Sequence, residues 1–263
     1  MKKERIISGL LLFLAVTIIL ILGNSLIISI ATSLIAILAI NEFFNSFKEK
    51  HNVERWIGNI LAIAIAFINY IPQNFIGIIF PSIIAILFLK VIVTEMKTNF
   101  VDIAISGFGV FYIIGFISFL PLIYKLENGK ILIWYLAFAA WGTDTFAYAI
   151  GMKFGKHKLT PVSPKKSVEG SIAGVLGAVI FSLIYTYSIN KLGNMNISYL
   201  AIVAISAMLS VLAQIGDLSA SSIKRYTGIK DFGHLIPGHG GVLDRIDSIL
   251  FIAPFAYFLL TLI

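Results

Sequence analysis

Long apolar runs are the feature that most constrains the fold of this 263-residue chain. A helix of about 17–25 apolar residues is long enough to cross a bilayer. The runs that qualify are 6–22, 25–40, 57–72, 74–93, 100–124, 131–152, 171–189, 197–217 and 246–263. Charged residues make up only 13% of the chain and hydrophobic residues 59%, too little polar surface to cover a soluble core. The sequence therefore predicts an all-α, polytopic integral membrane protein with about nine transmembrane helices.

The links between these runs predict how the helices are grouped. Polar turns at Gly23-Asn24 and Gln73-Asn74 predict two helical hairpins. The first run follows a basic start, as a secretory signal does, but Ile21 is not the small residue expected three positions before a cleavage site, so a retained helix is favoured. We expect an N-terminal region of about five spans over 1–130, and a catalytic region over 131–263 with long loops at 153–170 and 218–245.

Basic residues predict the orientation of the chain. With nine spans, all but three of the 20 Lys and Arg residues fall on one side, the exceptions being Lys125, Lys130 and Lys191. Basic loops stay in the cytoplasm, so the N-terminus and both long loops are expected there, with the C-terminus outside the cytoplasmic (inner) membrane. The net charge of +7 then faces anionic lipids or phosphorylated substrates, and no nucleic-acid-binding module is present.

Two aspartates, one inside an apolar run and one at the end of another, are candidate functional residues. Asp144 lies inside the sixth run, roughly 13 Å from its cytoplasmic end. A carboxylate at this depth indicates either a functional site or a protonated or hydroxyl-paired side chain that holds two helices together. Asp217 closes the eighth run. If that helix continues, Asp217, Ser221, Lys224 and Arg225 share one face, which could bind a metal and phosphates. Alone, this second pattern is more typical of a solvated helix end with its usual cations.

Asp244 and Asp247 stand one helical turn apart at the start of the ninth run. Two acids in a first turn can simply complement the helix dipole. However, the Gly-rich segment 237–241 leads directly into them, and backbone N–H groups in such a turn can approach an anion closely. Convergent carboxylates suit Mg²⁺, which takes oxygen ligands and keeps waters for substrate phosphates.

The loop between the sixth and seventh runs is the third candidate element. Ser163, Lys165, Lys166 and Ser167 place two cations and two hydroxyls together, as a phosphate-binding loop does. The alternative is an ordinary basic cytoplasmic loop, which we accept for its other lysines. The chain has no cysteine, which excludes thiol nucleophiles and cysteine-bound metals.

Residues 221–247 closely resemble the signature of phosphatidate cytidylyltransferases (CDP-diacylglycerol synthases). The segment reads Ser-x-x-Lys-Arg, then Lys-Asp at 230–231, Phe-Gly-His-Leu-Ile-Pro-Gly-His-Gly-Gly over 232–241, and Asp-Arg-x-Asp over 244–247. The resemblance extends to Asp144, to 163–170 and to 214–217. Ser167 stands where many members of the family carry Thr, and the hydroxyl is kept.

This resemblance implies that CTP and phosphatidate react to give CDP-diacylglycerol and diphosphate. Mg²⁺ is the implied cofactor, with a second cation left open, and a homodimer in the lipid bilayer is implied as well. The implied catalytic residues are Asp217, Asp244, Lys165, Lys166, Lys224, Arg225 and Arg245. The implied metal ligands are Asp217, Asp244, Asp144 and Asp247. The implied substrate-binding residues are Ser163, Ser167, Glu169, Ser221, Lys230, Asp231, His239, Gly240 and Gly241.

The candidate residues are chemically suited to such a reaction, but other functions remain open. A phosphate monoester is largely ionised near pH 7, so it needs positioning and charge neutralisation more than a base, and we expect His239 to shape the Gly-rich turn. A CTP-dependent enzyme for another lipid, such as an archaeol phosphate or an isoprenoid alcohol, would look similar. A transporter would also carry intramembrane aspartates, although no internal repeat is visible here.

Overall fold

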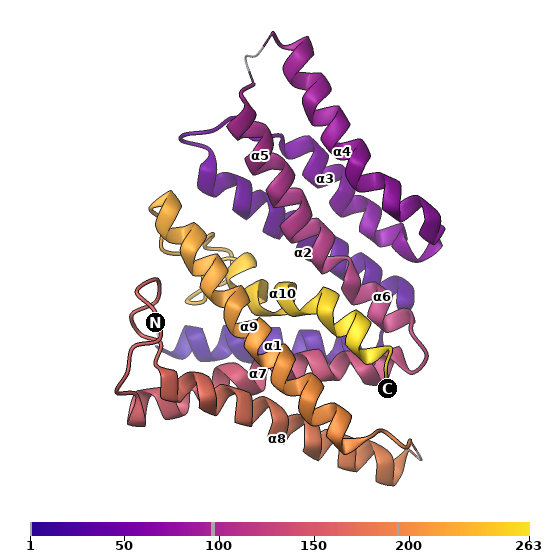
Figure 1. Ribbon diagram of the computed structural model, residues 1–263, viewed down its shortest axis with the longest axis vertical. Coiled ribbons are helices and arrows are strands. Elements are labelled where there is room, and N and C mark those ends of the chain that lie inside the picture. Colours follow the sequence, from indigo (N-terminus) through magenta and orange to yellow (C-terminus); the bar gives the residue numbers. More distant parts are fainter. Residues whose placement is uncertain (1, 96–97, 194) are drawn as a thin grey trace. The chain divides into compact units, whose positions relative to one another are not determined.

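A computed structural model describes residues 2–95, 98–193 and 195–263 of the chain (Figure 1). Lys97, one of the basic residues used for the orientation, lies outside these ranges. The described residues are helical at each of the nine apolar runs, so the all-α prediction is confirmed. Four segments are long and apolar enough to cross a membrane: Ser25–Phe47, Phe100–Lys125, Val168–Leu192 and Tyr199–Thr227. These helices are those of a membrane protein.

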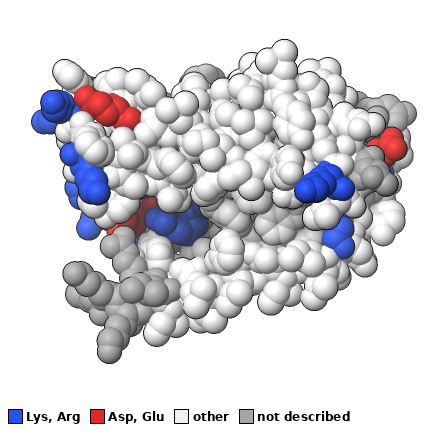
Figure 2. All heavy atoms as spheres, turned by 90° about the horizontal axis from the view of Figure 1, so that it is seen from below, with Lys and Arg blue, Asp and Glu red and all other residues white. Residues whose placement is uncertain are grey.

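Charged side chains are sparse on the surface of the protein. Figure 2 shows one face, where Lys, Arg, Asp and Glu form small patches and other residues cover most of the area. Large apolar side chains are exposed on many helices, among them Leu11, Leu34 and Leu200. Exposed apolar surface of this extent agrees with helices that face lipid rather than water.

Two compact units make up the chain. The first comprises Met1–Lys125 and Thr227–Arg245, and the second comprises Leu126–Tyr226 and Ile246–Ile263. The Gly-rich segment 237–241 therefore packs with the N-terminal helices. The division into a 1–130 region and a catalytic 131–263 region stays a prediction about function.

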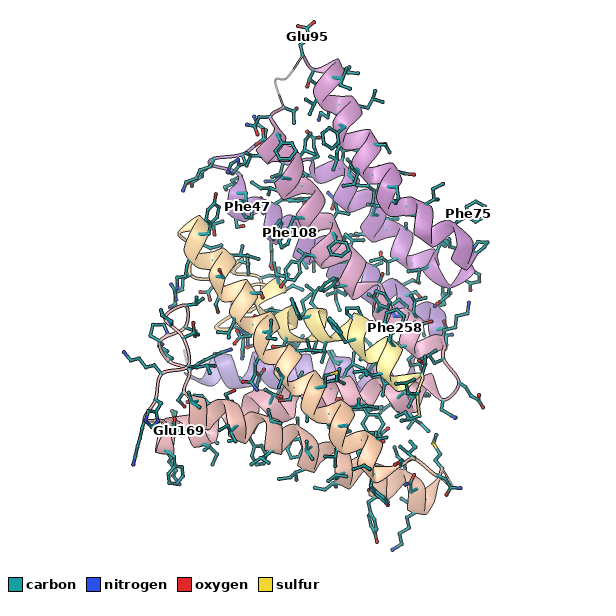
Figure 3. All side chains as sticks on the ribbon, viewed as in Figure 1. Phe47, Phe75, Glu95, Phe108, Glu169 and Phe258 are labelled. Atoms are coloured by element: carbon teal, nitrogen blue, oxygen red, sulfur yellow. The ribbon has the colours of Figure 1, made fainter. Side chains whose placement is uncertain are left out.

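The first unit is built around α2. Its helical segments are α1 (Lys2–Leu22), α2 (Ser25–Phe47), α3 (Arg55–Ala64), the 3₁₀ segment η1 (Ile65–Tyr70), α4 (Gln73–Val93), α5 (Phe100–Gly109), the π-helical η2 (Val110–Gly115) and α6 (Phe119–Lys125). Helix α2 packs against α3, α5, α6 and both η segments. Its Phe43 and Phe44 are fully buried, and the ring of Phe43 lies 6.1 Å from that of Phe108, which Figure 3 labels. This aromatic core fixes α2 within the unit.

The two predicted hairpin turns have different outcomes. At the first, Asn24 accepts the Ile27 N–H at 2.9 Å and caps α2, so the tight polar turn is confirmed. At the second, Gln73 is already the first residue of α4, so the break lies at 71–72 and the predicted position was wrong. Proline fixes φ and lacks an N–H, which suits Pro72 to the start of a helix.

In the second unit, α7 (Gly129–Phe154) and α8 (Val168–Leu192) pack along their length. Glycines permit this close approach. A Cβ on Gly142 would lie 2.9 Å from the Cα of Ala178, and one on Gly177 would overlap the ring of Phe146. Small residues at helix crossings serve this purpose in membrane proteins. Because Gly142 contacts α8 here, the packing also fixes where the following residues, Thr143 and Asp144, lie relative to α8.

Helices α9 (Tyr199–Thr227) and α10 (Leu243–Leu260) complete the helical part of the chain. The hydroxyl of Ser210 in α9 lies 2.6 Å from that of Thr143, and both side chains are buried. Helix α9 runs without a break past Asp217 to Thr227, so the expected continuation of the eighth run is confirmed. Residues 218–227, expected in a loop, are therefore helical.

Candidate active site

A cavity of about 610 Å³ lies in the second unit, among α7, α8, α9 and the loop between α7 and α8. This volume is within the usual range for small-molecule sites. One part of its wall is apolar and includes Ala147, Tyr148, Met152 and Leu159. The polar lining residues are Thr143, Asp144, Ser163, Lys165, Lys166, Ser167, Ser171 and Gln214. Charged and apolar surfaces therefore meet in one cavity.

A charged cluster formed by Asp144, Lys166, Asp217, Lys224 and Asp247 adjoins this cavity. The ammonium of Lys166 forms an ion pair with the carboxylate of Asp217 on α9. Burial lowers the pKa of Lys166; the carboxylates of Asp144 and Asp247 act in the opposite direction, and the ammonium of Lys224 lowers it further. Three helices and a loop thus bring these five charges within electrostatic range of one another.

The charged cluster has the donor chemistry of a divalent-cation site. Carboxylate oxygens are the ligands that Mg²⁺ prefers, and the Lys166 ammonium pairs with the carboxylate of Asp217 and is within electrostatic range of Asp144 and Asp247. Within the described part of the chain, no three acidic or histidine side chains are close enough together to hold a metal between them. The assignment of Asp144, Asp217, Asp244 and Asp247 as metal ligands stays a prediction.

Asp244, in the first unit, organises the Gly-rich segment. Its side chain is 6% exposed, and its Oδ2 accepts the N–H groups of Phe232 at 2.8 Å and Gly241 at 3.0 Å. Gly240 has a φ of +82°, and a Cβ there would lie 2.9 Å from the same oxygen, so only glycine fits. Because the Gly241 N–H points to Asp244, the structure gives no support to a phosphate contact through that group.

His239 ties the same segment to α1. Its Nδ1 lies 2.9 Å from the hydroxyl of Ser8, and that hydroxyl donates to the carbonyl of Pro237 at 2.9 Å. Since the hydroxyl hydrogen is used at Pro237, we assign a hydrogen to Nδ1, which donates it to Ser8. This geometry agrees with the expected role of His239 in shaping the turn.

The loop between α7 and α8 is held by its own side chains. Ser167 caps α8, its Oγ accepting the Gly170 N–H at 3.1 Å. Glu169, labelled in Figure 3, accepts the N–H groups of Lys156 at 3.1 Å and His157 at 3.3 Å. The Nδ1 of His157 lies 2.6 Å from the same carboxylate. Glu169, predicted to bind substrate, therefore also anchors the loop to the start of α8.

The remaining predicted residues range from exposed to buried. The exposed basic residues are Lys165, Arg225, Lys230 and Arg245. Ser221 and Asp231 are partly buried, whereas Asp247 is 7% exposed. The roles given to these side chains stay predictions.

Glu42 in α2 is a polar residue that sequence reasoning missed. Its Oε1 accepts the N–H of Val242 at 2.9 Å, and its Oε2 accepts that of Leu243 at 2.8 Å, where α10 begins. A signal was present in the sequence, because Glu42 follows the apolar run 25–40 without any helix-breaking residue between them. An acidic side chain directly after an apolar helical run is rare and indicates that it pairs with a specific group.

Comparison with known proteins gives a match along the whole chain. Residues 3–263 match the cytidylyltransferase family. A phosphatidate cytidylyltransferase of Staphylococcus haemolyticus is 34% identical over 264 residues, which cover 98% of each chain. One of Staphylococcus aureus is 35% identical over 97% of this chain and 96% of the relative. One of Thermotoga maritima is 37% identical over 66% of this chain and 67% of the relative.

Proposed function

We infer that this chain, which belongs to the cytidylyltransferase family, transfers the cytidylyl group of CTP to phosphatidate and releases diphosphate. The relatives named phosphatidate cytidylyltransferase, matched over almost the full length, support this activity. One observation of the structure carries the proposal: an apolar wall and a charged cluster border the same cavity. A lipid phosphate requires both kinds of surface, because its tails are apolar and its headgroup is an anion.

The reaction makes one bond and breaks one bond at the α-phosphorus of CTP. An oxygen of the phosphatidate phosphate bonds to this phosphorus, and the bond from the phosphorus to the departing diphosphate breaks. The attacking phosphate is largely ionised at neutral pH, since its second pKa is about 6. The protein must therefore hold two anions together, for which Lys165, Lys166 and Lys224 supply positive charge beside the cavity.

The cofactor we propose is Mg²⁺, supported by the carboxylates that face the Lys166 ammonium. Asp217 and Asp244 would be the first ligands of the ion, as the sequence predicts, with Asp144 and Asp247 as further ligands or as groups that orient them. Bound there, Mg²⁺ would neutralise charge on the triphosphate and the leaving diphosphate. Lys166 would then be available to a substrate phosphate as a point charge.

We propose nine membrane spans, with the N-terminus and the site on the cytoplasmic side of the cytoplasmic membrane and the C-terminus outside. The distribution of basic residues and the helical backbone at every apolar run support this arrangement. It gives the site access to cytosolic CTP while the lipid tails stay in the bilayer. The homodimer is proposed from the family resemblance alone.

The test is a product assay with purified protein, phosphatidate and CTP labelled in the α-phosphate. We expect labelled CMP to appear on the lipid and unlabelled diphosphate to be released in equal amount. Chelation of divalent cations should stop the reaction, and added Mg²⁺ should restore it. Parallel assays with an archaeol phosphate and an isoprenoid alcohol separate the alternative lipid substrates. Labelling of only these lipids would contradict phosphatidate as substrate, and labelling of no lipid would contradict the transferase.

A further inference from the structure

The first turn of α10 is capped by a side chain from α2, far away in the sequence. Glu42 lies 200 residues before Val242, and each of its two oxygens accepts one backbone N–H at the start of α10. These N–H groups have no acceptor within the helix, because the first turn lacks a preceding one. A carboxylate at this end also complements the positive end of the helix dipole. The Glu42 carboxylate is therefore matched to this position in geometry and in charge.

Two glycines of the signature segment make room for that carboxylate. A Cβ on Gly233 would lie 2.5 Å from Oε1 of Glu42, and a Cβ on Gly241 would overlap Oε2. At both positions the three nearest atoms belong to Glu42. Neither glycine has a positive φ, so backbone conformation is not the reason for glycine there. The segment is instead shaped around the carboxylate.

Glu42 and Asp244 accept hydrogen bonds from adjacent parts of the same short segment. Asp244 accepts the N–H groups of Phe232 and Gly241, whereas Glu42 accepts those of Val242 and Leu243, the next two residues. The backbone that carries Asp244 is thus fixed on its N-terminal side by Glu42. Charge-assisted hydrogen bonds of this kind are stronger than neutral ones.

We propose that Glu42 is a positioning residue for cytidylyl transfer, which sets the start of α10 and with it the orientation of the Asp244 carboxylate. The proposal rests on the proposed function, since Asp244 is one of the residues expected to serve the reaction. It gives α2, in the N-terminal half of the chain, a defined part in orienting Asp244 within the first unit.

The first test is Glu42→Gln. Glutamine has the same shape but only one acceptor oxygen, so one of the two N–H groups would face an amide N–H₂ instead. We expect kcat/KM per folded molecule to fall by about 10- to 100-fold, the range found when partners that orient a ligand are removed. The Mg²⁺ concentration for half-maximal rate should rise, because Asp244 would be held less firmly. A loss of global stability alone would lower the folded fraction and leave that Mg²⁺ requirement unchanged.

Glu49→Gln is the matched control, because Glu49 is exposed just beyond the end of α2. It should leave both the rate and the Mg²⁺ requirement as they are. Amide hydrogen exchange gives a readout that needs no activity: exchange at Val242 and Leu243 should be faster in Glu42→Gln than in either the control or the unchanged protein. If the unchanged protein shows no transferase activity, the proposed function fails, while the exchange result still decides the role of Glu42.

A double-mutant cycle tests the contact itself, and its single variant Gly233→Ala covers the case in which Glu42→Gln does not fold. Gly233→Ala keeps Glu42 but displaces its carboxylate, so it should raise the Mg²⁺ requirement. In the Glu42→Ala background the added methyl group meets no carboxylate, so Gly233→Ala should have little further effect. Equal effects of Gly233→Ala in both backgrounds would overturn the proposal. So would a folded Glu42→Gln protein with unchanged kcat/KM, Mg²⁺ requirement and amide exchange.

Discussion

Lys166 shows how one side chain can organise a site. It pairs with Asp217 and lies within range of Asp144 and Asp247, so its single charge offsets several carboxylates. Unpaired carboxylates brought this close would repel one another and resist ionisation. The sequence predicted each of these residues as a candidate. It did not predict that Lys166 faces the acids, because that contact depends on how α9, α10 and the loop pack.

Replacement of Asp217 by Asn tests this cluster. The amide keeps the shape but removes the charge that pairs with Lys166 and that we expect to bind Mg²⁺. Turnover should fall by at least about 100-fold, as when a group that stabilises transition-state charge is lost, while the protein stays folded. The measurement is the Mg²⁺-dependent rate per folded molecule. Lys158→Ala is the control, because Lys158 is exposed in the loop that carries Lys166. This change should lower the rate only slightly. A near-normal rate in Asp217→Asn would show that the metal assignment is wrong.

His239→Gln tests whether the reaction needs a protein base. The contact of His239 with Ser8 indicates a structural role, so the variant should slow turnover by loosening the turn. The rise of kcat/KM between about pH 5.5 and 7 should remain, because it reports ionisation of the phosphatidate phosphate, whose second pKa is about 6. The measurement is a pH profile of both proteins at saturating Mg²⁺. Disappearance of the rise in the variant would identify His239 as the base.

At the scale of elements, the α7–α8 pair determines where Thr143 and Asp144 lie. The sequence predicted both helices from their apolar runs, and their described bounds contain the predicted ones. It did not identify Gly142 and Gly177 as contact points, because a glycine in an apolar run has the same appearance whether it faces lipid or a neighbouring helix. The break between the third and fourth runs was misplaced because the prediction placed the turn at Gln73-Asn74, although Pro72 is typical of the start of the next helix.

Gly142→Ala tests this packing. The new methyl group would lie 2.9 Å from backbone of α8 at Ala178, so the two helices must separate. We expect a cost of about 1–3 kcal/mol, typical of overpacking, seen as earlier thermal unfolding in detergent together with a lower rate. Gly77→Ala is the matched control, because among the described side chains and the backbone of other helices no atom lies within 4 Å of its Cβ position. There alanine should stabilise the helix slightly, by up to about 1 kcal/mol. Equal melting of the two variants would contradict the packing argument.

At the scale of the whole molecule, composition alone predicted an all-α membrane protein, and the resemblance of residues 221–247 predicted the family. Segment 227–245 packs with the N-terminal helices, which neither composition nor periodicity indicates. The contact between Glu42 and α10 was missed for the same reason: the partners are 200 residues apart, and no local pattern relates them. Long-range pairing of this kind follows from packing and is visible only in the structure.

The orientation of the chain can be tested with two tags. The excess of basic residues on one side predicts that a tag after Ile263 is accessible from outside the cytoplasmic membrane, whereas one in the loop at Lys166 is accessible only from the cytoplasm. Labelling of intact and of opened cells with a reagent that does not cross membranes distinguishes the two sides. Labelling of both tags from the same side would exclude nine spans and the proposed location of the site.

The link from Glu42 to Leu243 has a consequence for synthesis of the protein. The two residues are 201 positions apart, and a ribosome adding about 5–20 residues per second needs roughly 10–40 s to pass from one to the other. During that interval α2 is complete, but the N–H groups that its carboxylate accepts do not yet exist. Nascent α2 must therefore keep the Glu42 carboxylate in water or shielded by the insertion machinery until the last helix emerges.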